Sequence, residues 1–228
     1  MVMSSEPKLP RETVAELREA GIRRGPLLVV DCDEVIVEFA GHLARWLPDV
    51  GYEMRLKKYE LEGAIFPHGD PTPVSFDAAI NLINAFFEEQ TAYQTPLVGA
   101  VEALSRLRRE VQTVVLTNIP RPGKRDRLAN LASLGLDLPV IVNSGGKGRA
   151  LAWLAKAAGA EAGRERMVFV DDSPQQIASA ARRAPHVGRI HFRGAEAIRH
   201  VLGHAEHADV AVEDWAACEA EIRGYLRL

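Results

Sequence analysis

Residues 27–39 read LLVVDCDEVIVEF, in which an apolar run ends in two aspartates, Asp31 and Asp33, one residue apart. Four consecutive apolar residues predict a short strand that is buried on both faces. Carboxylates at the end of such a strand raise the free energy of an apolar core unless other groups compensate their charge. Two such acids alone are also typical of a loop or a helix cap, so the rest of the sequence must show whether they belong to a functional site.

The rest of the chain repeats this pattern of a short apolar run followed by a helix. Segments such as GKRDRLANLASLG, KGRALAWLAKAAG and SPQQIASAARRA carry apolar residues at helical spacing, and both ends of the chain show helical patterns. Strands alternating with helices of this length predict a parallel sheet with helices on both faces, a Rossmann-like α/β fold. Besides 27–30, the expected strands are residues 111–116, 139–142, 167–170 and 188–192.

The stretch between the first two strands is far too long for one crossover. Its last part, TPLVGAVEALSRLRRE, is typical of a crossover helix, which leaves residues 38–95. We expect this remainder to be a small all-helical insertion, with residues 1–37 and 96–228 forming the α/β core. One of its helices should begin after Ser75 as the N-cap and carry an apolar stripe. The stripe would consist of Phe76, Ile80, Ile83 and Phe87.

Composition narrows the class of protein. The chain has 228 residues, of which 47 % are apolar and 26 % charged, and its net charge is −3. That charge gives no electrostatic reason to expect a nucleic-acid polymer or a membrane surface as partner. The first residues lack the pattern of a signal peptide, no apolar run could span a bilayer, and the only cysteines are Cys32 and Cys218. We expect a cytoplasmic protein without disulfides.

Polar residues follow each of the first four expected strands. Asp31 and Asp33 follow the first strand, Thr117 and Asn118 the second, Lys147 the third, and Asp171 with Asp172 the fourth. Ligands of open parallel sheets bind at the carboxyl ends of the strands, so these side chains should meet there. Four carboxylates at one point repel each other, and Lys147 offsets only one charge. If Asp33 carries a proton, a divalent cation balances the rest, and oxygen ligands of this kind suit Mg²⁺.

These motifs carry a resemblance to a known family. The segments VVDCDEV, VVLTN, GGKGRALAWL and MVFVDDSPQQIASA resemble, in order and spacing, the four motifs of the haloacid dehalogenase-like hydrolase superfamily. The resemblance covers residues 26–193. It implies a Rossmann-like core with a small helical cap of the C1 type inserted after the first strand, in this chain residues 38–95. It also implies a phosphatase acting on a small phosphorylated metabolite.

The resemblance further implies a role for each motif residue. Asp31 resembles the nucleophile that forms an aspartyl-phosphate, and Asp33 resembles the general acid and base. Thr117, the backbone amide of Asn118, and Lys147 would hold the phosphoryl group. The Mg²⁺ ligands would be Asp31, the backbone carbonyl of Asp33, and the pair formed by Asp171 and Asp172, of which we favour Asp172 as the direct ligand.

Two features bear on the substrate. The dehalogenase branch of the superfamily lacks an acid at the position of Asp33, so this residue favours phosphate esters. Glu34 stands where many phosphatases of the superfamily carry Gly, and Val35 stands where Thr is commoner. Glu34 adds a negative charge near the site, which leaves the preferred substrate open.

Other functions remain as alternatives. A 5′-nucleotidase-like activity or a phosphomutase would use the same chemistry. A signalling receiver domain also groups aspartates, Thr and Lys around Mg²⁺, but in another motif order, and a homologue that has lost activity would only bind. SGGKGRA is not a phosphate-binding P-loop, because Ile141 and Gly148 stand where Gly and a hydroxyl residue are required. Two further features predict no site: His200, His204 and His207 should form a solvated surface, and Cys32 should be a buried, inert thiol.

Overall fold

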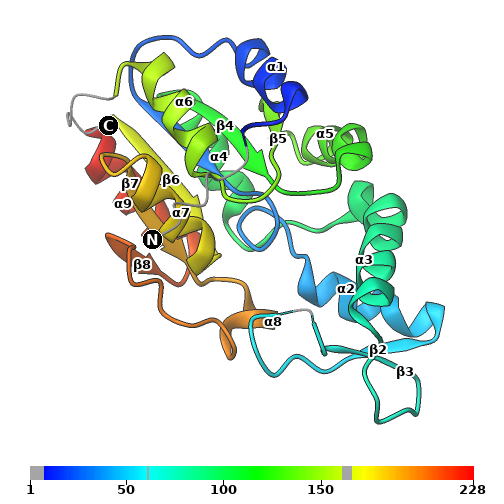
Figure 1. Cartoon of the computed structure of the whole chain (residues 1–228). Helices are drawn as coiled ribbons and strands as arrows, with labels where there is room; N and C mark the ends of the chain where they lie inside the picture. The colour runs from blue at the N-terminus through cyan, green and yellow to red at the C-terminus, as the bar shows by residue number, and fades with distance from the viewer. Residues whose placement is uncertain (1–7, 61, 161–165) are drawn as a thin grey trace, which may run out of the picture.

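The computed structural model describes residues 8–60, 62–160 and 166–228. A sheet of six parallel strands lies at its centre, in the order β5-β4-β1-β6-β7-β8 (Figure 1). The first strand lies inside the sheet, with its last residue, Val30, paired with Val115 on one side and Val170 on the other. The strands are β1 (Leu27–Val30), β4 (Gln112–Thr117), β5 (Val140–Val142), β6 (Met167–Asp171), β7 (Gly188–Phe192) and β8 (Val210–Val212).

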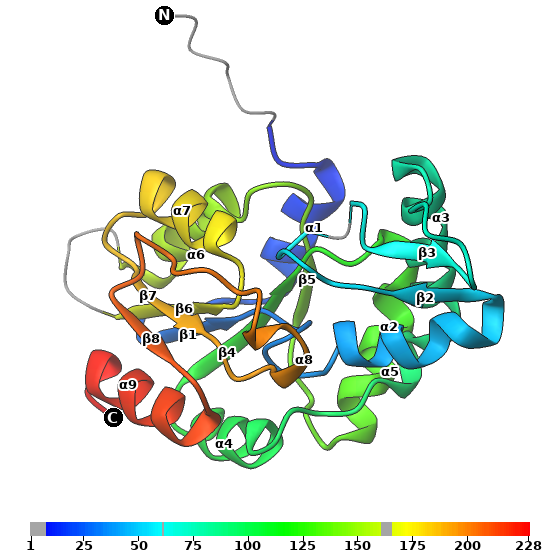
Figure 2. The same ribbon diagram turned by 90° about the horizontal axis from the view of Figure 1, so that it is seen from below.

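Helices cover both faces of the sheet, as Figure 2 shows. The side chains of β1 alternate between two apolar clusters, because successive residues of a strand point to opposite faces. Leu28 and Val30 join the cluster that contains residues of α4 and α9, whereas Leu27 and Val29 join the cluster of α1, α6 and α7. The core helices are α1 (Arg11–Glu19), α4 (Ala100–Leu107), α5 (Lys124–Ser133), α6 (Gly148–Ala158), α7 (Pro174–Arg183), α8 (Glu196–Arg199) and α9 (Trp215–Leu226).

The predicted α/β architecture is confirmed. The sheet has one strand more than we expected from the sequence. The five expected strands are present with ends that differ by one residue at most. The omitted strand is β8, at the edge of the sheet, of which only Val212 is fully buried. Three residues with mixed exposure form no recognisable period, so this strand could not be predicted from the sequence.

The segment between β1 and α4 lies beyond the carboxyl ends of the strands (Figure 1). Its two ends run side by side, since the Glu38 amide donates to the Thr95 carbonyl oxygen at 2.9 Å and Val37 pairs with Pro96. The segment contains α2 (Ala40–Trp46), the 3-10 helix Leu47–Val50, β2 (Tyr52–Met54), β3 (Ile65–Pro67), α3 (Phe76–Gln90) and the 3-10 helix Thr91–Tyr93.

This insertion is mostly helical, but the expectation of helices alone needs a correction. Strands β2 and β3 form an antiparallel hairpin, each with three residues, which is too short to show an alternating pattern. In α3 the Ser75 hydroxyl accepts from the Ala78 amide, as expected of an N-cap. The predicted stripe is only half right, because Phe76 and Ile80 are 56 % and 40 % exposed. The buried face of α3 consists of Ala79, Ile83, Phe86 and Phe87.

Among the described residues, no helix combines the length and the apolar character needed to cross a bilayer.

Candidate active site

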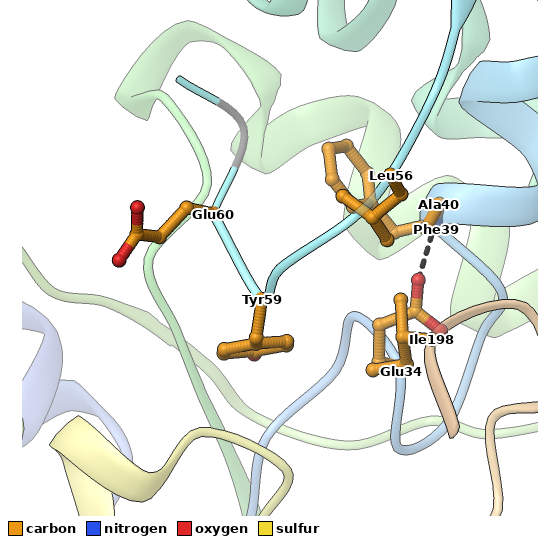
Figure 3. Close-up of a pocket in the computed structure, with 7 residues that line it drawn as sticks. All are labelled: Glu34, Phe39, Ala40, Leu56, Tyr59, Glu60 and Ile198. Atoms are coloured by element: carbon orange, nitrogen blue, oxygen red, sulfur yellow. Dashed lines mark hydrogen bonds between the residues drawn. The ribbon is translucent and has the colours of Figure 1, made fainter. Parts of the chain in front are cut away.

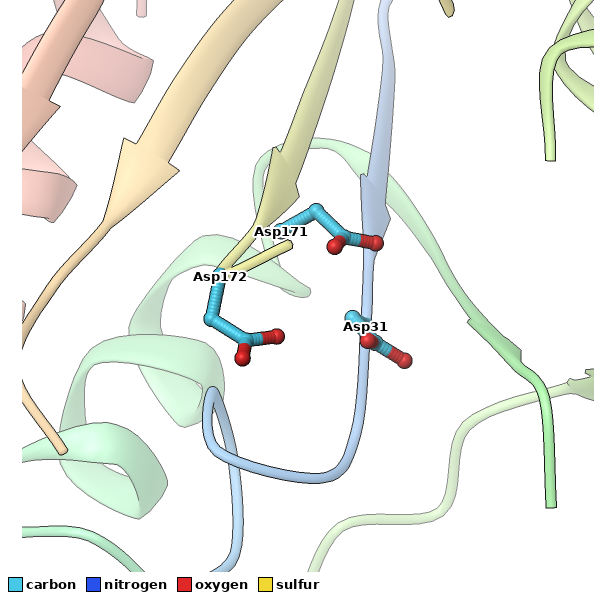
Figure 4. A group of neighbouring side chains, drawn as sticks. All are labelled: Asp31, Asp171 and Asp172. Carbon is cyan, nitrogen blue, oxygen red and sulfur yellow. The ribbon is translucent and has the colours of Figure 1, made fainter. Parts of the chain in front are cut away.

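Three carboxylates from two neighbouring strands face a common space at the sheet edge, as Figure 4 shows. Asp31 follows β1, Asp171 ends β6, and Asp172 comes next. One carboxylate oxygen from each lies within 4.8 Å of the other two. All three are at least nine-tenths buried. Parallel pairing of β1 with β6 brings these strand ends together, and this pairing is the physical basis of the cluster.

Lys147 is the cation of this cluster. Its Nζ lies 2.7 Å from Asp31 Oδ1 and 2.7 Å from Asp171 Oδ2, and its side chain is 1 % exposed. The two carboxylates raise the pKa of Lys147 above its ordinary value although burial opposes this, so the group stays charged. A buried ammonium that bridges two acids is a fixed positive charge next to the candidate nucleophile.

Close packing of α6 against α7 sets the position of Lys147. A Cβ at Gly148 would meet the Ser179 carbonyl oxygen at 2.2 Å, so the helices approach there as only glycine allows. The Lys147 amide also donates to Gln176 Oε1 at 2.8 Å. Gly148, which excludes a P-loop in the sequence, is thus required by the close approach of α6 and α7.

Asp171 and Asp172 have different surroundings. Both oxygens of Asp171 accept from protein donors: Oδ2 from Lys147 and Oδ1 from the Ser173 amide at 2.9 Å. Asp172 Oδ2 accepts from the Tyr59 hydroxyl of the insertion at 2.5 Å. The Asp172 carbonyl oxygen lies 2.9 Å from His191 Nε2. Asp171 is therefore held by the core, whereas Asp172 has a partner that the insertion supplies.

The cluster is short of positive charge. Burial is the main reason that the pKa of Asp31 rises to about 7, with the negative charge of Asp171 adding to it and Lys147 opposing it. Burial also raises the pKa of Asp172, again with a contribution from Asp171. Acids in this state take up either protons or a cation. Buried carboxylate oxygens with a net deficit of about two charges fit a small divalent ion such as Mg²⁺.

Asp33 belongs to a second, separate ion pair, which sequence analysis missed. Its Oδ1 lies 2.6 Å from Nη2 of Arg127, a residue of α5 whose side chain is fully buried. The same Nη2 donates to Gln94 Oε1 at 2.7 Å, and Gln94 Nε2 donates to Asp33 Oδ1 at 3.1 Å. Arg127 is one of several basic residues in its segment, so only the fold distinguishes it.

This pair changes the expected charge balance. The balance expected from the sequence, three acids against Lys147 and a divalent ion, holds if Asp33 carries a proton. In the structure Arg127 offsets the charge of Asp33 instead. The remaining acids, Asp31, Asp171 and Asp172, still face the single charge of Lys147. The need for a divalent cation is the same, but it no longer depends on a proton at Asp33.

The second strand brings Thr117 to the site, and Asn118 contributes in another way. Thr117 is buried, with Oγ1 3.4 Å from Asp33 Oδ2. The Asn118 side chain donates to the Gly145 carbonyl oxygen at 2.8 Å and accepts from Asn143 at 3.0 Å. Asn118 therefore ties the end of β4 to the loop that precedes Lys147.

Glu34 follows the pair of aspartates in a conformation that explains why glycine suits this position. Its φ is +60°, one of only two positive values among the described non-glycine residues. The side chain is 4 % exposed, and Oε1 accepts a hydrogen bond from the Ala40 amide at the start of α2. Burial raises the pKa of Glu34 to about 7, although the bond from Ala40 opposes this.

The residues expected to lie outside the site do so. Cys32 is fully buried, and burial raises the pKa of its thiol. The three histidines His200, His204 and His207 are exposed, and His200 Nε2 lies 3.3 Å from the Leu56 carbonyl oxygen.

Comparison with known proteins identifies the fold. No family model matches the sequence, and a search of curated proteins found no significant match. A hydrolase of the haloacid dehalogenase family from Deinococcus radiodurans, solved with bound phosphate and sodium, matches with a TM-score of 0.62 and 19 % identity over 88 % of this chain and 96 % of its own.

Two further solved structures agree. A haloacid dehalogenase-like protein of unknown function from Agrobacterium tumefaciens matches with a TM-score of 0.59 and 20 % identity, over 88 % of this chain and 98 % of its own. A defluorinating L-2-haloacid dehalogenase matches with a TM-score of 0.54 and 12 % identity, over 89 % and 99 %. The chain has the haloacid dehalogenase-like fold, as its motifs predicted.

Proposed function

We propose that this chain is a hydrolase of the haloacid dehalogenase-like superfamily, a Mg²⁺-dependent phosphatase for a small phosphorylated molecule. The observation that carries the proposal is the convergence of Asp31, Lys147, Asp171 and Asp172 at the carboxyl edge of the sheet. Phosphoryl transfer needs an in-line nucleophile and positive charge around the phosphoryl oxygens, and little else from the protein. This cluster offers the nucleophile and one fixed charge, and it fits a divalent cation.

Asp31, Asp172 and the Asp33 carbonyl oxygen would hold the cation, with Asp171 holding Lys147 in place. When bound, Mg²⁺ would neutralise charge on the phosphoryl oxygens. We assign Lys147 and Thr117 to the phosphoryl group, together with the backbone amide of Asn118. We also propose residues 1–37 and 96–228 as the catalytic core and residues 38–95 as the cap over it.

The reaction would take place in two steps. In the first, Asp33 enters as the acid and carries a proton. An Asp31 oxygen attacks phosphorus, the bond to the leaving oxygen breaks, and this oxygen takes the proton from Asp33. In the second, Asp33 accepts a proton from water, the water oxygen attacks phosphorus, and the bond to Asp31 breaks. Inorganic phosphate leaves and both aspartates return to their first state.

Asp33 supports phosphate-ester chemistry over dehalogenation. A halide leaves without a proton, so a dehalogenase has no use for a second acid, whereas an alkoxide leaving group needs one. Arg127 and Gln94 hold this acid near Thr117 rather than in solvent. A 5′-nucleotidase-like enzyme and a phosphomutase share this chemistry, and a receiver domain or a binding homologue would not turn over.

The test is hydrolysis of p-nitrophenyl phosphate and a panel of phosphorylated metabolites, with Mg²⁺ or with EDTA. We expect multiple turnovers that need Mg²⁺ and that fall at least about 10³-fold in Asp31→Asn. Asp137→Asn, at an exposed aspartate outside the site, is the matched control and should keep the wild-type rate. Activity that persists in Asp31→Asn or in EDTA would reject the mechanism. Release that stops at one phosphate per chain would indicate a receiver.

The role of Asp33 has its own test. Asp33→Asn keeps the shape of the side chain but cannot exchange a proton, so both steps should slow. We expect the covalent intermediate to accumulate, measured as the added mass of one phosphoryl group on the intact chain. Wild-type turnover in Asp33→Asn would remove the assigned role.

A further inference from the structure

An open pocket of about 260 Å³ lies beside the acid cluster, between the start of α2 and the loop that joins β2 and β3 (Figure 3). Its walls are mainly apolar and come from three regions that are far apart in the sequence. The residues that matter for its chemistry are Glu34, Phe39, Leu56, Tyr59, Glu60 and Ile198.

Two residues place this pocket next to the site of phosphoryl transfer. Tyr59 lines the pocket, and its hydroxyl donates to Asp172 Oδ2 at 2.5 Å. Glu34 lines the opposite side and stands three residues after Asp31. A phosphoryl group held by Asp31 and Lys147 would therefore have the pocket within reach of its leaving group.

Glu34 has one carboxylate oxygen without a partner. Its Oε1 accepts from the Ala40 amide, whereas its buried Oε2 has no hydrogen-bond partner among the residues that the structure describes. A buried acceptor without a donor destabilises the fold, and more so if it is charged. Binding of a donor at Oε2 would satisfy this acceptor.

The charged residues among those that line the pocket are both acidic, Glu34 and Glu60. Glu60 is a second carboxylate on the wall, and no lysine or arginine is among the described residues that line it. Anionic leaving groups would be repelled here, and a polyol would find few polar partners on walls formed by Phe39, Leu56 and Ile198. Phe39 and Tyr59 add aromatic rings, which attract cations.

We propose that this pocket selects phosphate monoesters whose leaving group is a small apolar body with a protonated amine. The ammonium group would donate to Glu34 Oε2, and the apolar part would contact Phe39, Leu56 and Ile198. This assignment rests on the proposed phosphatase activity and adds the substrate class to it.

The experiment compares three matched series of substrates in the full chain with Mg²⁺. ω-Aminoalkyl phosphates with about two to five carbons are set against alkyl phosphates, in which a methyl group replaces the ammonium, and against ω-carboxyalkyl phosphates. We expect kcat/KM for the best amine to exceed that of its alkyl counterpart at least about tenfold, and the carboxylates to be the poorest. Glu34→Gln keeps an oxygen for the Ala40 amide but removes the charge, so it should abolish most of this preference.

The readout for Glu34→Gln is the ratio of kcat/KM between each amine and its alkyl counterpart, both measured in the same variant, so a general loss of activity does not count as loss of the preference. Glu60→Gln, at the exposed acid, should reduce the amine preference by a smaller factor. Glu88→Gln, at an exposed acid of α3 outside the pocket, is the control and should change nothing. Hydrolysis of p-nitrophenyl phosphate without any amine preference would overturn this inference and leave the proposed function intact.

A binding measurement keeps the two proposals separable if no ester is hydrolysed. Calorimetric titration with the free ω-amino alcohols should show binding in wild type and in Asp31→Asn, and loss of at least tenfold in affinity in Glu34→Gln. Absence of turnover together with this binding would overturn the phosphatase proposal and support the pocket. Equal affinity for amino alcohols and plain alcohols would overturn the pocket assignment.

Discussion

Two buried cations serve the candidate site, and they lie in regions of different origin. Lys147 bridges Asp31 and Asp171, all three at or near the ends of core strands. Arg127 pairs with Asp33 and with Gln94, which stands at the end of the insertion. The first group, Lys147 with Asp31 and Asp171, is the Lys147 region, and all three residues belong to the sequence motifs. The second group, Arg127 with Asp33 and Gln94, is the Arg127 region. Of these only Asp33 belongs to a motif, and the other two come close to it only through packing.

The difference shows how a strand-end site is completed. The carboxyl ends of neighbouring parallel strands lie at the same edge of the sheet. Acids that directly follow β1 and β6 therefore come together because these two strands pair. Asp33, the proposed general acid and base, lies two residues beyond Asp31 and takes its partners from outside the sheet. Helix α5 and the returning end of the insertion provide that support. The chemistry of Asp33 thus depends on the same junction that attaches the insertion to the core.

The largest effect should come from Lys147→Met. This change leaves Asp31 and Asp171 without their cation and removes a charge assigned to the phosphoryl group, so kcat/KM should fall at least about a hundredfold. Lys156→Met, at an exposed lysine in α6, the helix that follows Lys147, is the matched control. Near-normal activity in Lys147→Met would show that the Lys147 region is structural only.

Arg127→Met should act first on stability. It leaves the Asp33 carboxylate and Gln94 without their buried donor, and breaking such a pair costs about 3 kcal/mol. Urea unfolding of Arg127→Met and of the control Arg125→Met, at an exposed arginine of α5, measures the difference. Arg127→Lys keeps the charge and should be intermediate. Equal urea midpoints for Arg127→Met and Arg125→Met would show that the pairing of Arg127 with Asp33 does not stabilise the fold.

The pH dependence of stability distinguishes the two regions again. The folded pKa of Asp31 is raised to about 7, so its protonated form stabilises the metal-free chain fully below about pH 4, and that contribution is lost as pH rises through 7. We expect the metal-free melting temperature to fall between pH 5 and pH 8, by an amount equivalent to about 2 kcal/mol. Mg²⁺ should therefore raise the melting temperature more at pH 8 than at pH 5.

Asp31→Asn provides the control for this pH series, because an amide does not titrate. In that variant the fall between pH 5 and pH 8 should be smaller. An equal effect of Mg²⁺ at both pH values, or an unchanged pH profile in Asp31→Asn, would contradict a cluster that takes up either protons or a cation.

Tyr59→Phe should have the smallest effect. The change removes the hydrogen bond that Tyr59 donates to Asp172, so metal-free stability should fall by about 1 kcal/mol. Mg²⁺ affinity, measured by calorimetry, should rise because Asp172 Oδ2 no longer accepts from the phenol. Tyr93→Phe, at a tyrosine that is 72 % exposed, is the control. Reduced Mg²⁺ affinity in Tyr59→Phe would instead show that the Tyr59 hydroxyl assists metal binding.

The sequence by itself determined the alternation of strands and helices and the order in which acids, Thr117 and Lys147 follow the strands. These features are local: a run of apolar residues, a helical period and the residue directly after each run are visible without knowing what packs against them. The hairpin of β2 and β3 and the edge strand β8 were not predictable, because three-residue strands have no readable period.

Only the tertiary structure decided the pairing of Asp33 with Arg127, 94 positions away, and of Tyr59 with Asp172, 113 positions away. It also decided that Glu34 lines a pocket, with one carboxylate oxygen that has no hydrogen-bond partner in the part of the chain that the structure describes. The physical reason is the same in each case. A partner chosen by packing between distant segments leaves no pattern in the local sequence, whereas a strand end carries its residue to the sheet edge wherever the strand pairs.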